Sequence, residues 1–169
     1  MNCSGVIRRV DELGRVVIPI EIRRLLGIKE GESLEFIIRD NCIEIKKKSV
    51  IENNQMLFNE IFEKLCELIE GRLIITDREK VFHSSDYKIL NKSFDENIKD
   101  LLSTHNDTTL NNTSLLFDDY CIKSTFYIYP YYSESDIAGF IILYEISSID
   151  KYLKLIKFIT SYIHDKLSL

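Results

Sequence analysis

Five arginines lie in one short and otherwise apolar stretch, Gly5–Arg24, near the start of the chain. They are Arg8, Arg9, Arg15, Arg23 and Arg24. The guanidinium group keeps its charge and donates two parallel hydrogen bonds from a planar fork, a geometry that suits phosphates and guanine edges. A stretch of this kind therefore points to contact with a nucleic acid.

The same stretch is divided by a turn and a proline, and both limit its fold. Apolar and β-branched residues on either side of the run 11–14 favour two short strands, and proline suits the first turn of a helix. Ile22, Leu25 and Leu26 then follow at helical spacing. We expect, in order, a strand over 6–10, a turn over 11–14, a strand over 15–18 and a helix that begins after Pro19 and is closed by Gly27.

A β-hairpin is predicted next, because apolar and polar residues alternate over 34–39 and 42–46. The pair Asp40-Asn41 stands between the two runs and suits a tight two-residue turn. The whole module would hold about 48 residues without a metal or disulfide, and modules of this size are marginally stable alone. We therefore expect it to dimerise.

The second part of the chain has the pattern of an α+β domain with an antiparallel sheet. Apolar residues recur at helical spacing near its start and its end, with short apolar runs between them. The expected elements are a helix from Phe58 to Ile69, a hairpin over 73–76 and 81–84, a helix from Ser93 to residue 102, a loop over 104–118, strands over 121–129 and 137–145, and a helix from Tyr152 to Ile163. The loop is either a lid over a pocket or a mobile segment.

The run VDELGRVVIPIEIRRLLGI, residues 10–28, resembles the N-terminal signature of the AbrB/SpoVT/MazE-like transition-state regulators, which are swapped-hairpin DNA-binding proteins. The resemblance implies that two chains interleave their hairpins into one small β-barrel, an intertwined dimer bound to double-stranded DNA. Arg8, Arg15, Arg23 and Arg24 match the DNA-contacting arginines of the family. Arg9 joins this set, although strand alternation places it on the face opposite Arg8. The alternative is that these arginines are solvated surface charges paired with Asp11, Glu12 and Glu21.

Two pieces further along, residues 74–78 and 90–93, resemble the GAF-like regulatory half of longer members of this family. The resemblance implies a DNA-binding domain over residues 1–52 and a GAF-like signal-sensing or oligomerising domain over 53–169. It implies a homo-oligomer, either a dimer or a dimer of dimers, that controls sporulation genes in a spore-forming bacterium. Any small-molecule ligand of the second domain is unidentified, because the residues carry no ligand signature.

An antitoxin that represses its own operon is the alternative, since antitoxins share the N-terminal module. Their inhibitory tails are characteristically short and extended. Residues 55–169 instead carry enough periodic apolar sequence to fold, which favours a transcription factor.

Charge is divided unevenly along the chain, whose net charge is -5. Residues 1–50 carry 10 Lys/Arg and 8 Asp/Glu, whereas residues 51–169 carry 12 and 19. Because salt screens charges beyond about 8–10 Å, cations gathered on one face can still bind DNA. The acidic second part is not expected to contact DNA itself.

Other classes of protein find little support in the residues. No glycine-rich phosphate loop, paired-histidine motif or nucleophile signature is present, so no catalytic residue, metal or cofactor is assigned. The four cysteines, Cys3, Cys42, Cys66 and Cys121, lack zinc or redox spacing and are expected to be reduced and mostly in the core. No apolar run could span a bilayer, which predicts a cytoplasmic protein with no membrane partner.

Overall fold

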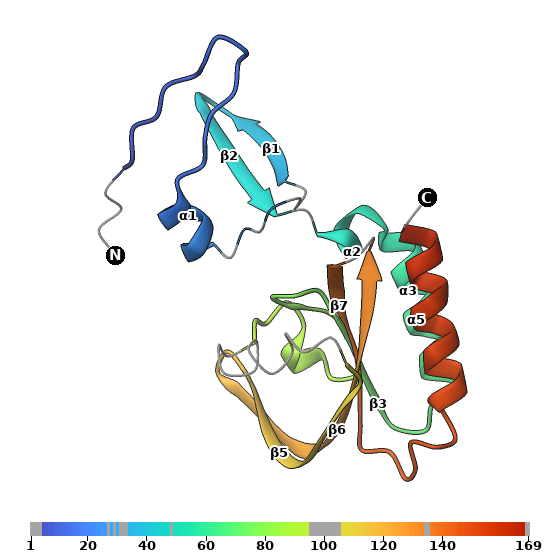
Figure 1. Cartoon of the computed structure of the whole chain (residues 1–169). Coiled ribbons are helices and arrows are strands. Elements are labelled where there is room, and N and C mark those ends of the chain that lie inside the picture. The colour runs from blue at the N-terminus through green and yellow to red at the C-terminus, as the bar shows by residue number, and fades with distance from the viewer. Residues whose placement is uncertain are drawn as a thin grey trace. The chain divides into compact units, whose positions relative to one another are not determined.

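The computed structural model of the chain describes residues 5–26, 28, 30, 34–47, 49–94, 106–133 and 136–167. The chain forms two compact units, residues 1–48 and 49–169. Both contain antiparallel β-sheet together with helices, so the predicted α+β class is confirmed (Figure 1). In the described ranges no helix is long and apolar enough to cross a membrane.

The first unit holds a short helix and a β-hairpin. Its elements are α1 (Ile20–Leu25), β1 (Leu34–Arg39) and β2 (Cys42–Lys47). The helix begins after Pro19, whose carbonyl oxygen accepts a hydrogen bond from Arg23 N at 2.9 Å. The strands join through Asp40-Asn41, and Asp40 has φ 51°, a left-handed conformation that Asp adopts more readily than most residues. The predicted helix and hairpin are confirmed; the predicted C-cap, Gly27, lies outside the described residues.

The two strands expected over 6–10 and 15–18 are not formed within the chain, and this prediction is wrong for the single subunit. Residues 5–18 run as irregular backbone that turns back on itself (Figure 1). The backbone hydrogen bonds described there lie at the turn, from Asp11 N to Arg15 O and from Gly14 N to Asp11 O, each 3.0 Å. A strand needs a neighbouring strand for its remaining N–H and C=O groups, and this single chain supplies none to the described residues 5–18.

The first unit has almost no core of its own. Among its described residues only Pro19 is buried. Ile7, Leu25 and Ile38 are 91%, 84% and 81% exposed. The register of β1 and β2 sets Phe36 opposite Ile45 and Ile38 opposite Ile43, so one face of the hairpin carries four exposed apolar side chains. The apolar surface that a folded module normally buries is therefore exposed in this unit.

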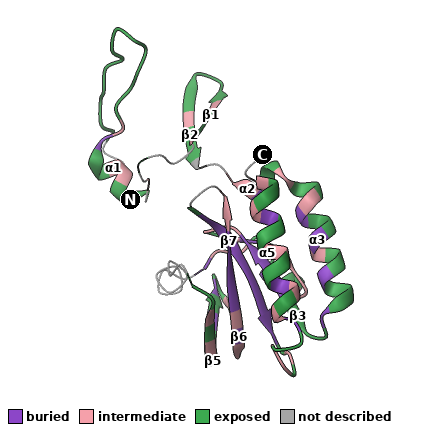
Figure 2. Ribbon diagram, turned by 45° about the vertical axis from the view of Figure 1, so that its right-hand side comes forward, coloured by how far each residue is buried: buried purple, intermediate pink, exposed green. Residues whose placement is uncertain are grey.

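The second unit is a five-stranded antiparallel sheet with two long helices on one face (Figures 1 and 2). The strand order is β4-β3-β7-β6-β5. Its elements are α2 (Val50–Asn53), α3 (Gln55–Leu68), β3 (Arg72–Thr76), β4 (Val81–Ser84), the 3-10 helix η1 (Tyr87–Ile89), β5 (Thr108–Phe117), β6 (Tyr120–Ser133), β7 (Asp136–Tyr144) and α5 (Leu153–Leu167). The predicted hairpin over 73–76 and 81–84, the two later strands and the first and last helices are confirmed.

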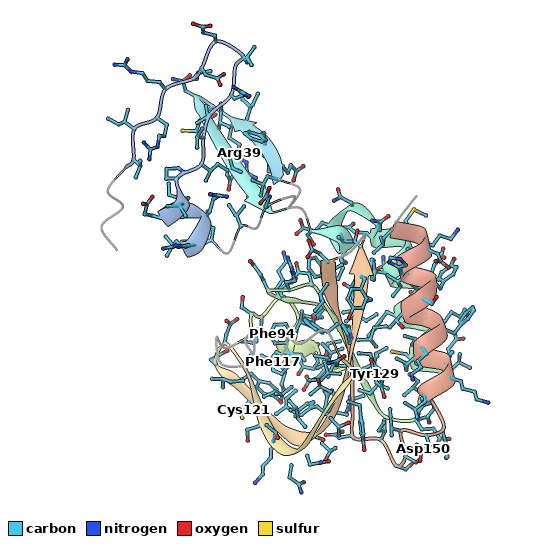
Figure 3. All side chains as sticks on the ribbon, viewed as in Figure 1. Arg39, Phe94, Phe117, Cys121, Tyr129 and Asp150 are labelled. Atoms are coloured by element: carbon cyan, nitrogen blue, oxygen red, sulfur yellow. The ribbon has the colours of Figure 1, made fainter. Side chains whose placement is uncertain are left out.

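The sheet is buried on both faces, which explains the continuous apolar runs in its central strands. Ile141 and Leu143 of β7 pack with the helices, whereas Ile142 faces a second cluster on the other side. That second cluster includes Phe94 and Phe117, whose rings lie 5.4 Å apart between centroids (Figure 3). β7 is buried along nearly its whole length in Figure 2. The core of the protein therefore sits in this unit.

The loop expected over 104–118 is wrong, because Thr108–Phe117 forms strand β5 and pairs with β6. Both the lid and the mobile-segment interpretations fail for these residues. Leu115 and Phe117 are fully buried, and this burial outweighs the loop-like Thr and Asn content. A register shift between Leu110 and Thr113, with Asn112 at φ 46°, accounts for the two asparagines. The helix expected from Ser93 to residue 102 falls mostly on residues 95–105, outside the described part of the chain.

Asp77 anchors the start of the second unit to the β3–β4 turn. Its carboxylate accepts hydrogen bonds from the backbone N–H of Glu79 at 2.7 Å and of Lys80 at 2.8 Å, and from the Ser49 hydroxyl at 3.3 Å. Lys80 also pairs with Glu52 at 2.9 Å. Burial raises the pKa of Asp77, because desolvation disfavours the charged carboxylate more than these hydrogen bonds favour it.

This raised pKa predicts a pH dependence of stability. The folded carboxyl group holds its proton more tightly than the unfolded one, so stability falls as pH rises from the ordinary Asp value of about 4 through the raised pKa. Asp77→Asn keeps an oxygen acceptor for the two backbone N–H groups and removes the charge. Its thermal midpoint, followed by circular dichroism, should exceed that of the wild type at pH 7, and the difference should shrink toward pH 3. A variant less stable than the wild type at pH 7 would contradict the prediction.

Candidate nucleic-acid interface

The turn that precedes α1 is built around one carboxylate. Asp11 Oδ1 accepts hydrogen bonds from the backbone N–H groups of Leu13 at 3.0 Å and Arg15 at 2.8 Å. Gly14 has φ +76°, a conformation that suits glycine because it lacks a Cβ atom. These contacts explain why the predicted turn over 11–14 forms even though the strands beside it do not pair.

Arg15 is held by the same carboxylate. Its Nε lies 2.8 Å from Asp11 Oδ2, while its side chain remains 71% exposed. The hydrogen bonds from Arg15, first from its backbone and then from its side chain, lower the pKa of Asp11. Because the Nε–H makes this bond, the two Nη groups of the guanidinium fork take no part in it.

The other predicted arginines lie on the same unit. Arg8 and Arg9 are exposed on the segment before the turn, so Arg8 and Arg15 flank the turn as expected. Arg23 and Arg24 lie in the last turn of α1, where cations are favoured by the helix dipole. Arg24 is exposed and Arg23 half-buried, with its Nε buried and without a hydrogen-bond partner in the described structure.

The cations of the hairpin are engaged differently. Glu44 lies between Arg39 (Figure 3) and Lys46, with N···O distances of 3.7 and 3.4 Å.

Asp11 was not predicted from the sequence to be the residue that organises the turn and holds Arg15. The spacing of an Asp three residues before a Gly is the signal that could have found it, because Asp side chains commonly bond backbone N–H groups two residues ahead.

In the described part of the chain, no group of three or more His, Cys, Asp or Glu side chains could hold a metal ion. His83 bonds the Asn59 amide at 2.7 Å, and burial lowers its pKa. Cys42, Cys66 and Cys121 are free and exposed, so the expectation that most cysteines lie in the core is wrong for these three.

The fold and the arginine-bearing turn together define a class, a small hairpin module with exposed cations joined to an α+β unit. Residues 7–52 match the family described as antidote-toxin recognition MazE, bacterial antitoxin. The stage V sporulation protein T of Bacillus subtilis (strain 168) is 42% identical over 100 residues, which are 57% of this chain and 56% of that protein. The transition state regulatory protein AbrB of the same bacterium is 42% identical over 76 residues, covering 45% of this chain and 78% of AbrB.

A third relative, Abh of the same bacterium, is 51% identical over 47 residues, 28% of this chain and 51% of its own length. The chain belongs to the AbrB family of transition state regulators. The predicted resemblance is thereby confirmed, and family membership also confirms the expectation of a regulatory protein and not an enzyme. The matches span about half of the sporulation protein and of Abh.

Proposed function

We propose that this chain is a sequence-selective transcription regulator that binds double-stranded DNA and controls sporulation genes from the cytoplasm. The observation that carries the proposal is that five exposed or half-buried arginines lie just before the Asp11 turn, at its end and on α1, all within residues 7–52, which match the MazE family. Arg8, Arg15, Arg23 and Arg24 would contact phosphates and base edges, with Arg9 beside them.

The test is a selection of duplexes from a random DNA pool by the full chain. A sequence-selective regulator should enrich a defined motif, and it should bind DNA carrying that motif more tightly than a scrambled duplex of equal composition. If repeated rounds enrich no motif, sequence selectivity is excluded.

We further propose that the DNA-binding domain, residues 1–52, forms an intertwined dimer with swapped hairpins. The uncovered apolar face of the hairpin supports this, because Phe36 and Ile38 are 64% and 81% exposed in the single chain. A second copy would bury this face and would supply the strand partners that residues 6–10 and 15–18 lack in the single chain.

This assembly predicts a clear effect of Ile38→Glu. A carboxylate placed on the buried face of the dimer should weaken association by on the order of 100-fold or more, since burying an unpaired charge is costly. Light scattering and sedimentation of the full chain measure it. Cys42→Glu adds the same charge at an exposed position that faces the opposite side of the hairpin, and it should leave the dimer intact. A wild-type protein that is a folded monomer at micromolar concentration would contradict the assembly.

For the second domain, residues 53–169, we propose a GAF-like role in sensing a small molecule or in joining two dimers into a tetramer. Its support is the antiparallel sheet covered on one face by α3 and α5. Its acidic excess, 19 Asp/Glu against 12 Lys/Arg over residues 51–169, argues against direct contact with DNA. A folded sheet with two apolar clusters is also unlike the short extended tail of an antitoxin, which leaves the regulator as the preferred function.

A further inference from the structure

We propose that Asp11 is a positioning residue that holds the Arg15 guanidinium in the orientation that reads DNA sequence. The inference rests on the proposed DNA-binding function and assigns a role to a carboxylate that does not itself contact DNA. Its basis is that one carboxylate bonds both the backbone and the side chain of the same arginine.

The geometry makes this pair unlike an ordinary surface ion pair. Exposed pairs usually contribute little, because two flexible side chains must be held in one arrangement. Here Asp11 Oδ1 is already fixed by the N–H groups of Leu13 and Arg15, and Asp11 N donates to Arg15 O at 3.0 Å. The carboxylate is therefore rigidly placed before its Oδ2 receives the Arg15 Nε at 2.8 Å.

The bond also leaves the reading edge of the arginine available. With Nε–H directed to Asp11, the two Nη groups form the end of the fork that can donate to guanine O6 and N7 or to a phosphate. The Arg15 side chain is 71% exposed and Asp11 40%, so the fork can reach a ligand.

Charge alone argues against an acidic residue at this place. A carboxylate at the turn repels the phosphates that Arg8 and Arg15 would attract. If Asp11 contributed only its charge, neutralising it should strengthen DNA binding. If Asp11 orients Arg15, neutralising it should weaken binding to the preferred sequence. The two roles can therefore be told apart by one substitution.

The test is Asp11→Asn in the full chain, because the Asn side-chain oxygen can still accept from Leu13 N and Arg15 N, while its NH₂ group cannot accept from Arg15 Nε. Affinity is measured for a duplex selected by the wild type and for a scrambled duplex. We expect affinity for the selected duplex to fall roughly 5- to 100-fold, the range for loss of one bidentate base contact. Affinity for scrambled DNA should stay the same or rise, since a negative charge is removed.

Glu12→Gln is the matched control, because it removes the same charge from an exposed neighbour for which the structure describes no bond to Arg15. It should not reduce the preference for the selected duplex. In an Arg15→Ala background, Asp11→Asn should cause little further loss, as expected for residues that act through one contact. Thermal unfolding of Asp11→Asn should match the wild type.

Three results would overturn the inference: full preference for the selected duplex in Asp11→Asn, equal loss on both duplexes together with a lower thermal midpoint, or an unchanged effect of Asp11→Asn in the Arg15→Ala background. A wild-type protein with no preference between the duplexes would instead contradict the proposed function itself.

Discussion

Replacing Arg8, Arg15, Arg23 and Arg24 together by alanine is expected to abolish DNA binding at physiological salt. If a dimer neutralises about six to eight phosphates with these side chains, wild-type affinity should fall ~10³- to 10⁵-fold between 50 and 200 mM salt. The variant should lose most of this salt dependence, because the slope counts the contacts that release counterions. Fluorescence anisotropy with a labelled duplex measures both quantities, and far-ultraviolet circular dichroism should be unchanged.

The matched control removes the same charge from the second unit. Its four substitutions to alanine are at the exposed positions Lys64, Lys123, Lys151 and Lys154. This control should bind nearly as tightly as the wild type, because its lost charges lie outside the proposed interface.

Changing an arginine that reads a base edge to lysine should not preserve binding, since lysine lacks the planar fork. If the quadruple alanine variant binds promoter DNA like the wild type, the cationic face lies elsewhere.

Gly139→Ala is expected to destabilise the second unit strongly. Tyr131 of β6 reaches across Gly139 of the neighbouring strand β7, and its hydroxyl donates to the Thr76 carbonyl of β3 at 2.7 Å. A Cβ atom at position 139 would lie under 3.0 Å from both the Thr76 oxygen and the Tyr131 hydroxyl. Because the Thr76 oxygen is backbone and Tyr131 is fully buried, neither can move aside without disturbing the sheet.

The loss should be about 2–5 kcal/mol, from overpacking and from a buried hydrogen bond that no longer forms. Denaturant unfolding monitored by circular dichroism and tyrosine fluorescence measures it. Gly5→Ala is the control, because a Cβ there would meet nothing within 4 Å, and it should leave stability unchanged. A Gly139→Ala protein as stable as the wild type would show that the Tyr131 crossing does not hold the three strands together.

Several features of this protein could be predicted because they depend on residues close together in the chain. The Asp40-Asn41 hairpin follows from the alternation on either side of it, and α1 follows from Pro19 and the spacing of Ile22 and Leu25. The helical stripes of α3 and α5 are equally local. The family relationship was also present in one continuous run, residues 10–28, and with it the set of candidate arginines.

Other features could not be predicted, because they depend on partners distant in sequence. Thr108–Phe117 has the composition of a loop, and only its pairing with β6 and the burial of Leu115 and Phe117 make it a strand. Conversely, residues 6–10 and 15–18 have the composition of strands and stay unpaired in the single chain, since a strand exists only when another strand accepts its hydrogen bonds.

Residues close together in the chain were enough to predict the arginine-rich turn, the short helix and the hairpin of the first unit, and the α+β class of the second. Folding was needed to show that Tyr131 spans Gly139 to reach Thr76, and that the sheet is buried on both faces. Hydrophobic spacing and turn chemistry act over a few residues, whereas long-range hydrogen bonds and packing depend on atoms that only folding brings together.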